Sequence, residues 1–176
     1  PEGDPRRGII DRPNQISRGP DGKFYVAGAS GIYRFDPANP AATVEAVVTG
    51  LPANGLHPLK AFALDSESNI YVNVGSFSNV CQSYTSHGSR DPKQNPDNFR
   101  GKQFSHCPEA ENETRGRAQI RRYKRLPDGK FSTEFTPFAK GLRNSMALTW
   151  SKAHKLLLQA ENNRDAIEKF APSLDS

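Results

Sequence analysis

The chain has 176 residues, of which 35% are hydrophobic, and a formal net charge of +5 from 24 Lys and Arg against 19 Asp and Glu. No apolar run approaches the roughly 18 residues that a transmembrane helix needs. The composition therefore excludes a membrane-spanning helix and predicts a globular piece of protein with a mildly basic surface.

Much of the basic excess lies in two segments, residues 90–102 and 115–125. A nucleic-acid-binding face would join such a patch to aromatic side chains that stack on bases. Neither segment shows that combination, so we interpret both as solvated surface and expect no nucleic-acid partner.

Three segments share one pattern, namely residues 16–28, 62–75 and 148–162. Each has an apolar residue, a polar turn of about six residues, and a second apolar run. Alternating apolar residues bounded by Gly, Pro, Asp and Ser are typical of two strands joined by a turn. The pattern predicts three strand-turn-strand units.

A second pattern follows the first two of these units. Residues 31–36 lead through a Pro-rich turn to 44–50, and residues 118–123 lead through a second turn to 135–141. Each reads as a hairpin, so that a full repeat holds four strands and no convincing helix. Four antiparallel strands in about 40 to 45 residues are the pattern of a β-propeller blade.

The spacing of the units supports a repeat. The first two begin 46 residues apart at Ile16 and Phe62, and the third begins 86 residues later at Leu148. The excess of about forty residues fits a polar segment at 78–116, which we interpret as a long inserted loop. A β-sandwich is also built from short strands, but it does not require this repetition.

We therefore expect an all-β chain, residues 1–176, that forms a single partial propeller domain of about three blades. The blades are predicted at about 9–50, 51–140 with the inserted loop, and 141–176. Closed propellers need about four to eight blades to remove their sheet edges, so the chain is expected to be part of a larger ring.

The two cysteines, Cys81 and Cys107, bracket most of the predicted loop. A disulfide between them would close a loop of about 26 residues and would indicate an oxidising compartment, either periplasmic or extracellular. The alternative is a zinc site that adds His87 and His106. Because His106 and Cys107 are adjacent, they are awkward ligands for one tetrahedral ion.

Polar clusters flank the third unit, at 141–146 and 160–165, and such an arrangement suggests a ligand site. His57 precedes the second unit at the same place in the repeat as Arg143 and Asn144 precede the third. Strand entrances on one side of a propeller converge on its axis. His57 could therefore serve as a base near neutral pH, or it could be a loop histidine held by a backbone carbonyl.

These residues resemble a known family, the glucose/sorbosone dehydrogenases, over about residues 51–167. The matching segments are His57 with Lys60, residues 69–81, Gly141-Leu142-Arg143-Asn144, and Glu161-Asn162-Asn163-Arg164-Asp165. The resemblance implies a six-bladed β-propeller of the soluble quinoprotein type, which uses pyrroloquinoline quinone (PQQ) and calcium.

The resemblance also implies roles. His57 falls at the family's base, which takes the hydroxyl proton of a sugar while its hydride passes to the quinone. Arg143 falls where the family contacts the quinone's oxygens, so we count it as both catalytic and cofactor-binding. Asn144 and Lys60 are likewise expected to bind the cofactor.

Calcium is expected at the last segment. Asn162 falls where a side-chain amide touches the cofactor and a backbone carbonyl helps to hold the ion, with Asn163 beside it. Asp165 falls at a carboxylate ligand. Carboxylate and carbonyl oxygens are what calcium prefers, and a guanidinium and amide donors suit the carboxylates of PQQ.

The expected substrate is an aldose sugar or a related alcohol or aldehyde, with an electron acceptor that the sequence does not name. Two alternatives stay open. A calcium-dependent lactonase would use Glu161, Asn144 and Asp165 as ligands. A non-catalytic propeller would bind a protein or glycan through the excursion between Cys81 and Cys107.

Overall fold

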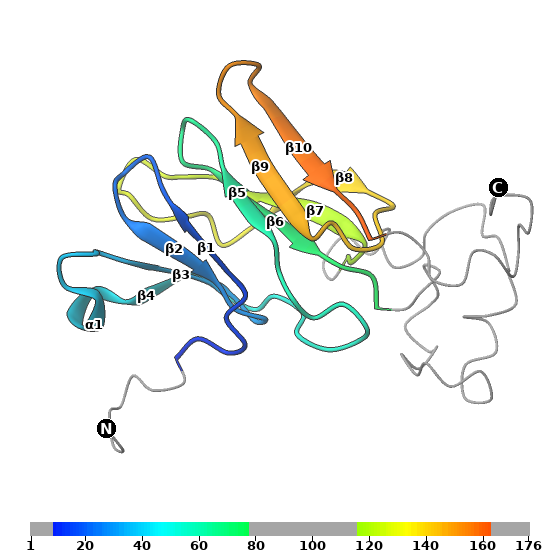
Figure 1. Ribbon diagram of the computed structural model, residues 1–176, viewed down its shortest axis with the longest axis horizontal. Helices are drawn as coiled ribbons and strands as arrows, with labels where there is room; N and C mark the ends of the chain where they lie inside the picture. The colour runs from blue at the N-terminus through cyan, green and yellow to red at the C-terminus, as the bar shows by residue number, and fades with distance from the viewer. Residues whose placement is uncertain (1–8, 78–115, 163–176) are drawn as a thin grey trace, which may run out of the picture.

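The computed structural model describes residues 9–77 and 116–162 (Figure 1). These residues form three antiparallel sheets and one four-residue helix, α1 (Pro40–Thr43), which confirms the all-β prediction. The helix occupies the predicted Pro-rich turn, because Pro40 already has the backbone angle of a first helical residue. Within the described ranges no helix is long and apolar enough to cross a membrane.

The first sheet is a four-stranded meander in which each strand pairs with the next. Its strands are β1 (Gln15–Arg18), β2 (Phe24–Ala27), β3 (Ile32–Phe35) and β4 (Glu45–Val48). The second sheet has the same order, with β5 (Phe62–Leu64), β6 (Ile70–Val74), β7 (Gln119–Tyr123) and β8 (Thr136–Lys140). Both predicted four-stranded units are present.

The third sheet is the hairpin of β9 (Ala147–Ser151) and β10 (Leu156–Ala160). It corresponds to the first half of each preceding sheet. The two complete sheets also share an irregularity, a register shift in the pairing of the third strand with the fourth. The shift lies between Ile32 and Tyr33 in the first sheet and between Ile120 and Arg121 in the second. Meanders of this kind are the units from which propeller blades are built.

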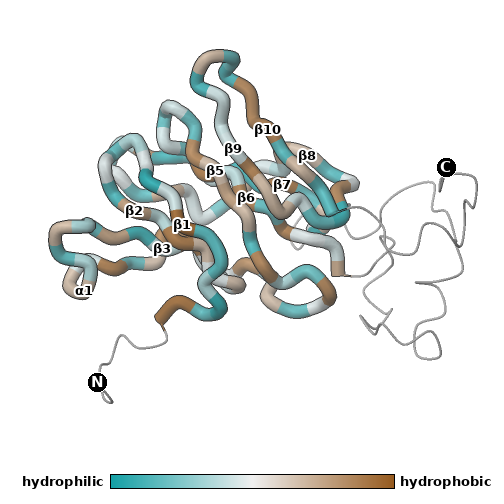
Figure 2. Tube along the Cα trace, in the orientation of Figure 1, coloured by the Kyte–Doolittle hydropathy of each residue, from teal (hydrophilic) through white to brown (hydrophobic). Residues whose placement is uncertain are grey.

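The main core lies between the first two sheets, and the apolar segments of Figure 2 follow their strands. The alternation of a strand explains this position, since Ile70, Val72 and Val74 share one face of β6 and all three belong to this core. Their partners in the cluster are Tyr25, Ala27, Ile32, Val48, Leu51, Phe62, Tyr123 and Phe131.

The opposite face of β6 looks toward β9. Tyr71 lies on this face and stacks on Trp150, with ring centroids 5.9 Å apart. The second core cluster contains Tyr71 together with Ala61, Ala63, Ile120 and Leu148. Every residue of β6 is buried. A polar residue on this strand must therefore find its hydrogen bonds inside the protein, and Asn73 is such a residue.

The interpretation of residues 115–125 as solvated surface is wrong for two of their arginines. Arg117 and Arg121 are only 2% and 4% exposed. Arg121 donates to the carbonyl oxygen of Gly116 at 2.7 Å, and its guanidinium lies 4.0 Å from the ring centroid of Phe135. Carbonyl acceptors and ring faces replace water around these cations.

Candidate active site

The loops that precede β5 and β9 meet at the end of β6. The amide of Ser76, just beyond β6, donates to the carbonyl oxygen of Arg143 at 2.7 Å. The Nδ1 atom of His57 lies 2.8 Å from the carbonyl oxygen of Ser76 and 3.0 Å from its hydroxyl. The structure thus brings His57 and Arg143, 86 residues apart in the chain, to the same two-residue stretch of backbone.

Both loops approach Gly75 closely. A β-carbon placed on it would lie 2.5 Å from the β-carbon of His57 and 3.0 Å from Oδ1 of Asn144. Both distances are shorter than ordinary van der Waals contact. A residue without a side chain is needed at this position, because the histidine and the asparagine approach the backbone from two different loops, those that precede β5 and β9.

Asn73 orients Asn144. The Nδ2 group of Asn73 donates to Oδ1 of Asn144 at 3.1 Å, and Oδ1 of Asn73 accepts from the amide of Ser145 at 3.3 Å. With its oxygen accepting from Asn73, the amide of Asn144 presents its NH₂ group as a donor in the other direction. Sequence reasoning assigned no role to Asn73 or Ser76; the available signal was an asparagine inside a wholly apolar strand pattern.

The two ends of the third hairpin are tied together at the same place. The backbone amide of Arg143 donates to Oε1 of Glu161 at 2.6 Å. The side-chain Nη1 of Arg143 donates to the carbonyl oxygen of Asn162 at 3.0 Å. The amide of Asn162 donates to the carbonyl oxygen of Asn144, also at 3.0 Å. The polar clusters predicted at both ends of this unit therefore form one hydrogen-bonded group.

Lys60 occupies a different environment from the other candidates. It is fully buried, and its Nζ donates to the carbonyl oxygens of Pro52 at 2.8 Å and Pro58 at 2.5 Å. Burial, with a smaller effect from the nearby Arg117, lowers the pKa of Lys60 to about 7. These contacts hold the two ends of the loop that carries His57, and the cofactor-binding role of Lys60 stays a prediction.

Other predicted site residues lie outside the described part of the chain. They are Cys81 and Cys107 of the predicted disulfide and Asn163 and Asp165 of the predicted calcium site. Within residues 9–77 and 116–162 there is no cluster of three or more His, Cys, Asp or Glu side chains that could hold a metal ion. The disulfide and the calcium ligand set stay predictions.

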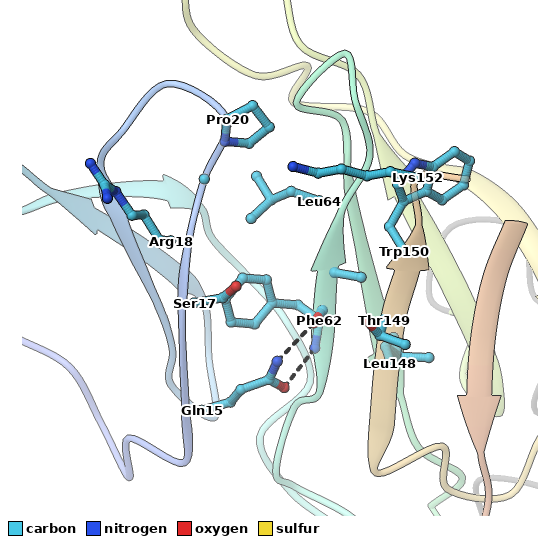
Figure 3. Close-up of a pocket in the computed structure, with 12 residues that line it drawn as sticks. Gln15, Ser17, Arg18, Pro20, Phe62, Leu64, Leu148, Thr149, Trp150 and Lys152 are labelled. Carbon is cyan, nitrogen blue, oxygen red and sulfur yellow. Dashed lines mark hydrogen bonds between the residues drawn. The ribbon is translucent and has the colours of Figure 1, made fainter. Parts of the chain in front are cut away.

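A pocket of about 330 Å³ lies where the first strands of the three sheets face each other (Figure 3). The side chain of Gln15 on β1 makes two hydrogen bonds to the backbone of Phe62 on β5. Its Nε2 donates to the Phe62 carbonyl oxygen at 2.8 Å, and its Oε1 accepts from the Phe62 amide at 3.0 Å. Arg18, the last residue of β1, and Lys152, directly after β9, also line the pocket. His57 and Arg143 instead precede β5 and β9, so they lie toward the opposite ends of these strands.

The fold of the chain is similar to that of solved structures. No protein-family model matches the chain, and no curated protein sequence matches it. Among solved structures, the PQQ domain of pyranose dehydrogenase from Coprinopsis cinerea, in its holo form, matches 86% of the chain with a TM-score of 0.59 and 23% sequence identity. The chain has the fold of the part of that PQQ domain that it matches.

Two structures of the carbohydrate-active enzyme family AA12 from Trichoderma reesei agree. The iodide structure matches with a TM-score of 0.59 and 22% identity, and the calcium structure with 0.58 and 21%. Each covers 86% of this chain, which spans about a third of the length of these relatives (33–34%). The resemblance drawn from the sequence is confirmed at the level of the fold.

Proposed function

We propose that the protein containing this chain oxidises an aldose sugar or a related alcohol or aldehyde, using PQQ and calcium. The observation that carries the proposal is the convergence of His57, Arg143 and Asn144 on the backbone of Gly75 and Ser76. The fold shared with a PQQ domain supports it. A base beside cationic and amide donors is the set of groups that such an oxidation needs.

The donor set fits a quinone that carries carboxylates. Arg143 supplies a guanidinium that is only partly buried, and Asn144 presents an amide NH₂. Next to them the hydroxyl of Ser145 is fully buried and has no hydrogen-bond partner among the described residues. Such a group is normally satisfied, so its partner is expected from outside the described residues. When bound, PQQ supplies the two-electron acceptor.

In the proposed reaction His57 takes the proton of the substrate hydroxyl on Nε2 while the hydride leaves the carbon that bears this hydroxyl. The C–H and O–H bonds break, the carbon becomes a carbonyl, and the two electrons leave with the hydride to the quinone. A neutral imidazole can accept this proton near pH 7. His57 is 8% exposed, so it is largely shielded from water.

The remaining predicted features belong to the same proposal. The chain supplies about three blades of a six-bladed propeller, at about 9–50, 51–140 and 141–176. The carbonyl of Asn162, Asn163 and the carboxylate of Asp165 hold calcium. A Cys81–Cys107 disulfide and a periplasmic or extracellular location complete it.

The lactonase alternative is less well supported. It would use Oε1 of Glu161 and Oδ1 of Asn144 as metal ligands. Oε1 of Glu161 accepts from the Arg143 amide, and Oδ1 of Asn144 accepts from Asn73. Each of these oxygens already accepts one hydrogen bond within the site, and a solved structure that shares the fold is a PQQ domain.

The decisive experiment uses the full-length protein with PQQ and calcium and follows reduction of an artificial electron acceptor by aldose sugars. We expect turnover only with both additions, and its loss in His57→Asn. The control is His154→Asn, which makes the same change at an exposed turn. Hydrolysis of gluconolactone with calcium alone would support the lactonase, and neither activity would support a binding module.

A further inference from the structure

We propose that Ser76 is a positioning residue that fixes the tautomer of His57, with the proton on Nδ1 and the lone pair on Nε2. The catalytic significance of this tautomer rests on the proposed function, but the tautomer itself is a property of the fold. Ser76 belongs to no site predicted from the sequence.

The argument starts from the atom that faces Nδ1. The carbonyl oxygen of Ser76 lies 2.8 Å from Nδ1 of His57, and a carbonyl oxygen can only accept a hydrogen bond. In the neutral imidazole one nitrogen donates and the other accepts. Nδ1 must therefore carry the proton, which leaves Nε2 as the basic nitrogen.

The hydroxyl of Ser76 agrees with this assignment. Its oxygen lies 3.0 Å from Nδ1, close enough to accept a share of the same N–H. If the hydroxyl donated to Nδ1 instead, Nδ1 would be an acceptor that faces the carbonyl oxygen at 2.8 Å, and the lone pairs of these two atoms would repel each other. Both contacts thus favour one arrangement.

The carbonyl is itself held in place. The amide of Ser76 donates to the carbonyl oxygen of Arg143 at 2.7 Å, and the carbonyl of the preceding Gly75 accepts from Nε of Arg117 at 3.2 Å. Ser76 is 1% exposed. Because both the N–H and the C=O of the Gly75–Ser76 peptide are hydrogen-bonded, His57 is oriented relative to Arg143, the residue proposed to bind the quinone.

The tautomer can be measured without any activity. Two-bond ¹⁵N–¹H correlation spectra of the full-length protein, labelled with ¹⁵N-histidine and recorded at pH 8, distinguish protonated from unprotonated ring nitrogens. The His57→Gln variant assigns the signals. We expect Nδ1 to be the protonated nitrogen of His57, and a protonated Nε2 would overturn the proposal. The outcome does not depend on turnover, so an inactive protein would challenge the proposed function and leave this inference intact.

Variants of Ser76 test its contribution to turnover. Ser76→Ala keeps the carbonyl and removes the hydroxyl, so we expect the same tautomer and a kcat lowered about three- to tenfold with little change in KM. Ser76→Thr restores a hydroxyl and should recover most of that loss. If Ser76→Ala folds and keeps full kcat, the hydroxyl has no positioning role. If either variant fails to fold, the spectrum of the unmodified protein still decides the tautomer.

Discussion

The amide of Ser76 donates to the carbonyl oxygen of Arg143 at 2.7 Å, and this bond joins the second sheet to the loop that begins the third. The other side of the same residue faces the ring of His57. A single peptide segment thus fixes the position of the proposed base relative to the proposed cofactor-binding arginine. Any change that moves this segment should disturb both residues together.

Gly75→Ala tests the close approach at this segment. The added β-carbon would lie 2.5 Å from that of His57, so the loops must separate. We expect a loss of about 1–3 kcal/mol in the free energy of unfolding, measured with urea, and a large loss of dye reduction. The comparison is Gly50→Ala, where the backbone angle φ is +72° but no atom lies within 4 Å. That variant should also lose stability yet keep its activity, and equal activities in the two variants would contradict the prediction.

Asn73→Asp tests the orientation of the Asn144 amide. A carboxylate can still accept from the Ser145 amide, but it cannot donate to Oδ1 of Asn144. Asn144 is then expected to turn its NH₂ group toward the aspartate and away from the ligand. We expect PQQ affinity, measured by calorimetric titration in calcium, to fall about tenfold, or about 1.4 kcal/mol. Asn39→Asp, at an exposed position, is the control and should bind PQQ normally.

Lys60 gives the folded protein a predictable pH dependence. Its pKa is about 7 in the folded chain against 10.5 for an ordinary lysine. Between these values the unfolded chain binds more protons, so stability should increase as the pH rises through this window. A neutral amine keeps two N–H groups for the carbonyls of Pro52 and Pro58.

The measurement is urea unfolding from pH 7 to pH 9 with Lys60→Met as the comparison. The unmodified protein should gain stability relative to the variant by at most about 1.4 kcal/mol per pH unit. Lys140→Met, at an exposed position of β8, should follow the unmodified protein. Parallel curves for Lys60→Met and the unmodified protein would show that Lys60 stays charged when buried.

Arg143→Met tests the relation between the arginine and the proposed calcium ion. Nη1 of Arg143 lies 3.0 Å from the carbonyl oxygen of Asn162, which is a proposed calcium ligand. The positive charge of the guanidinium would therefore repel a calcium ion bound to that oxygen. We expect calcium to bind about tenfold more tightly to the variant in calorimetric titrations without PQQ. Arg18→Met, which removes the same charge at the last residue of β1, should change calcium binding little. Weaker calcium binding in Arg143→Met would remove Asn162 from the ligand set.

The sequence alone determined the strands and their order. Alternating apolar residues between turn-forming residues predicted strand pairs at 16–28, 62–75 and 148–162 and hairpins at 31–50 and 118–141, and the structure has strands in each of these segments. The pattern is informative because side chains of a half-buried strand must alternate between core and solvent. The repeat of the pattern predicted that the sheets share one topology, which they do. The same repeat predicted that His57 and Arg143 occupy equivalent positions, each before the first strand of its unit.

Only the tertiary structure decided what these residues touch. Nothing in the local pattern shows that Ser76 bridges His57 and Arg143, or that Arg117 and Arg121 are buried in spite of their charge. Periodicity reports which face of a strand is apolar, whereas the partner of a buried polar group depends on how neighbouring sheets pack. Hydrogen bonds between residues far apart in the chain form only when that packing brings them within about 3 Å, so they leave no local trace in the sequence.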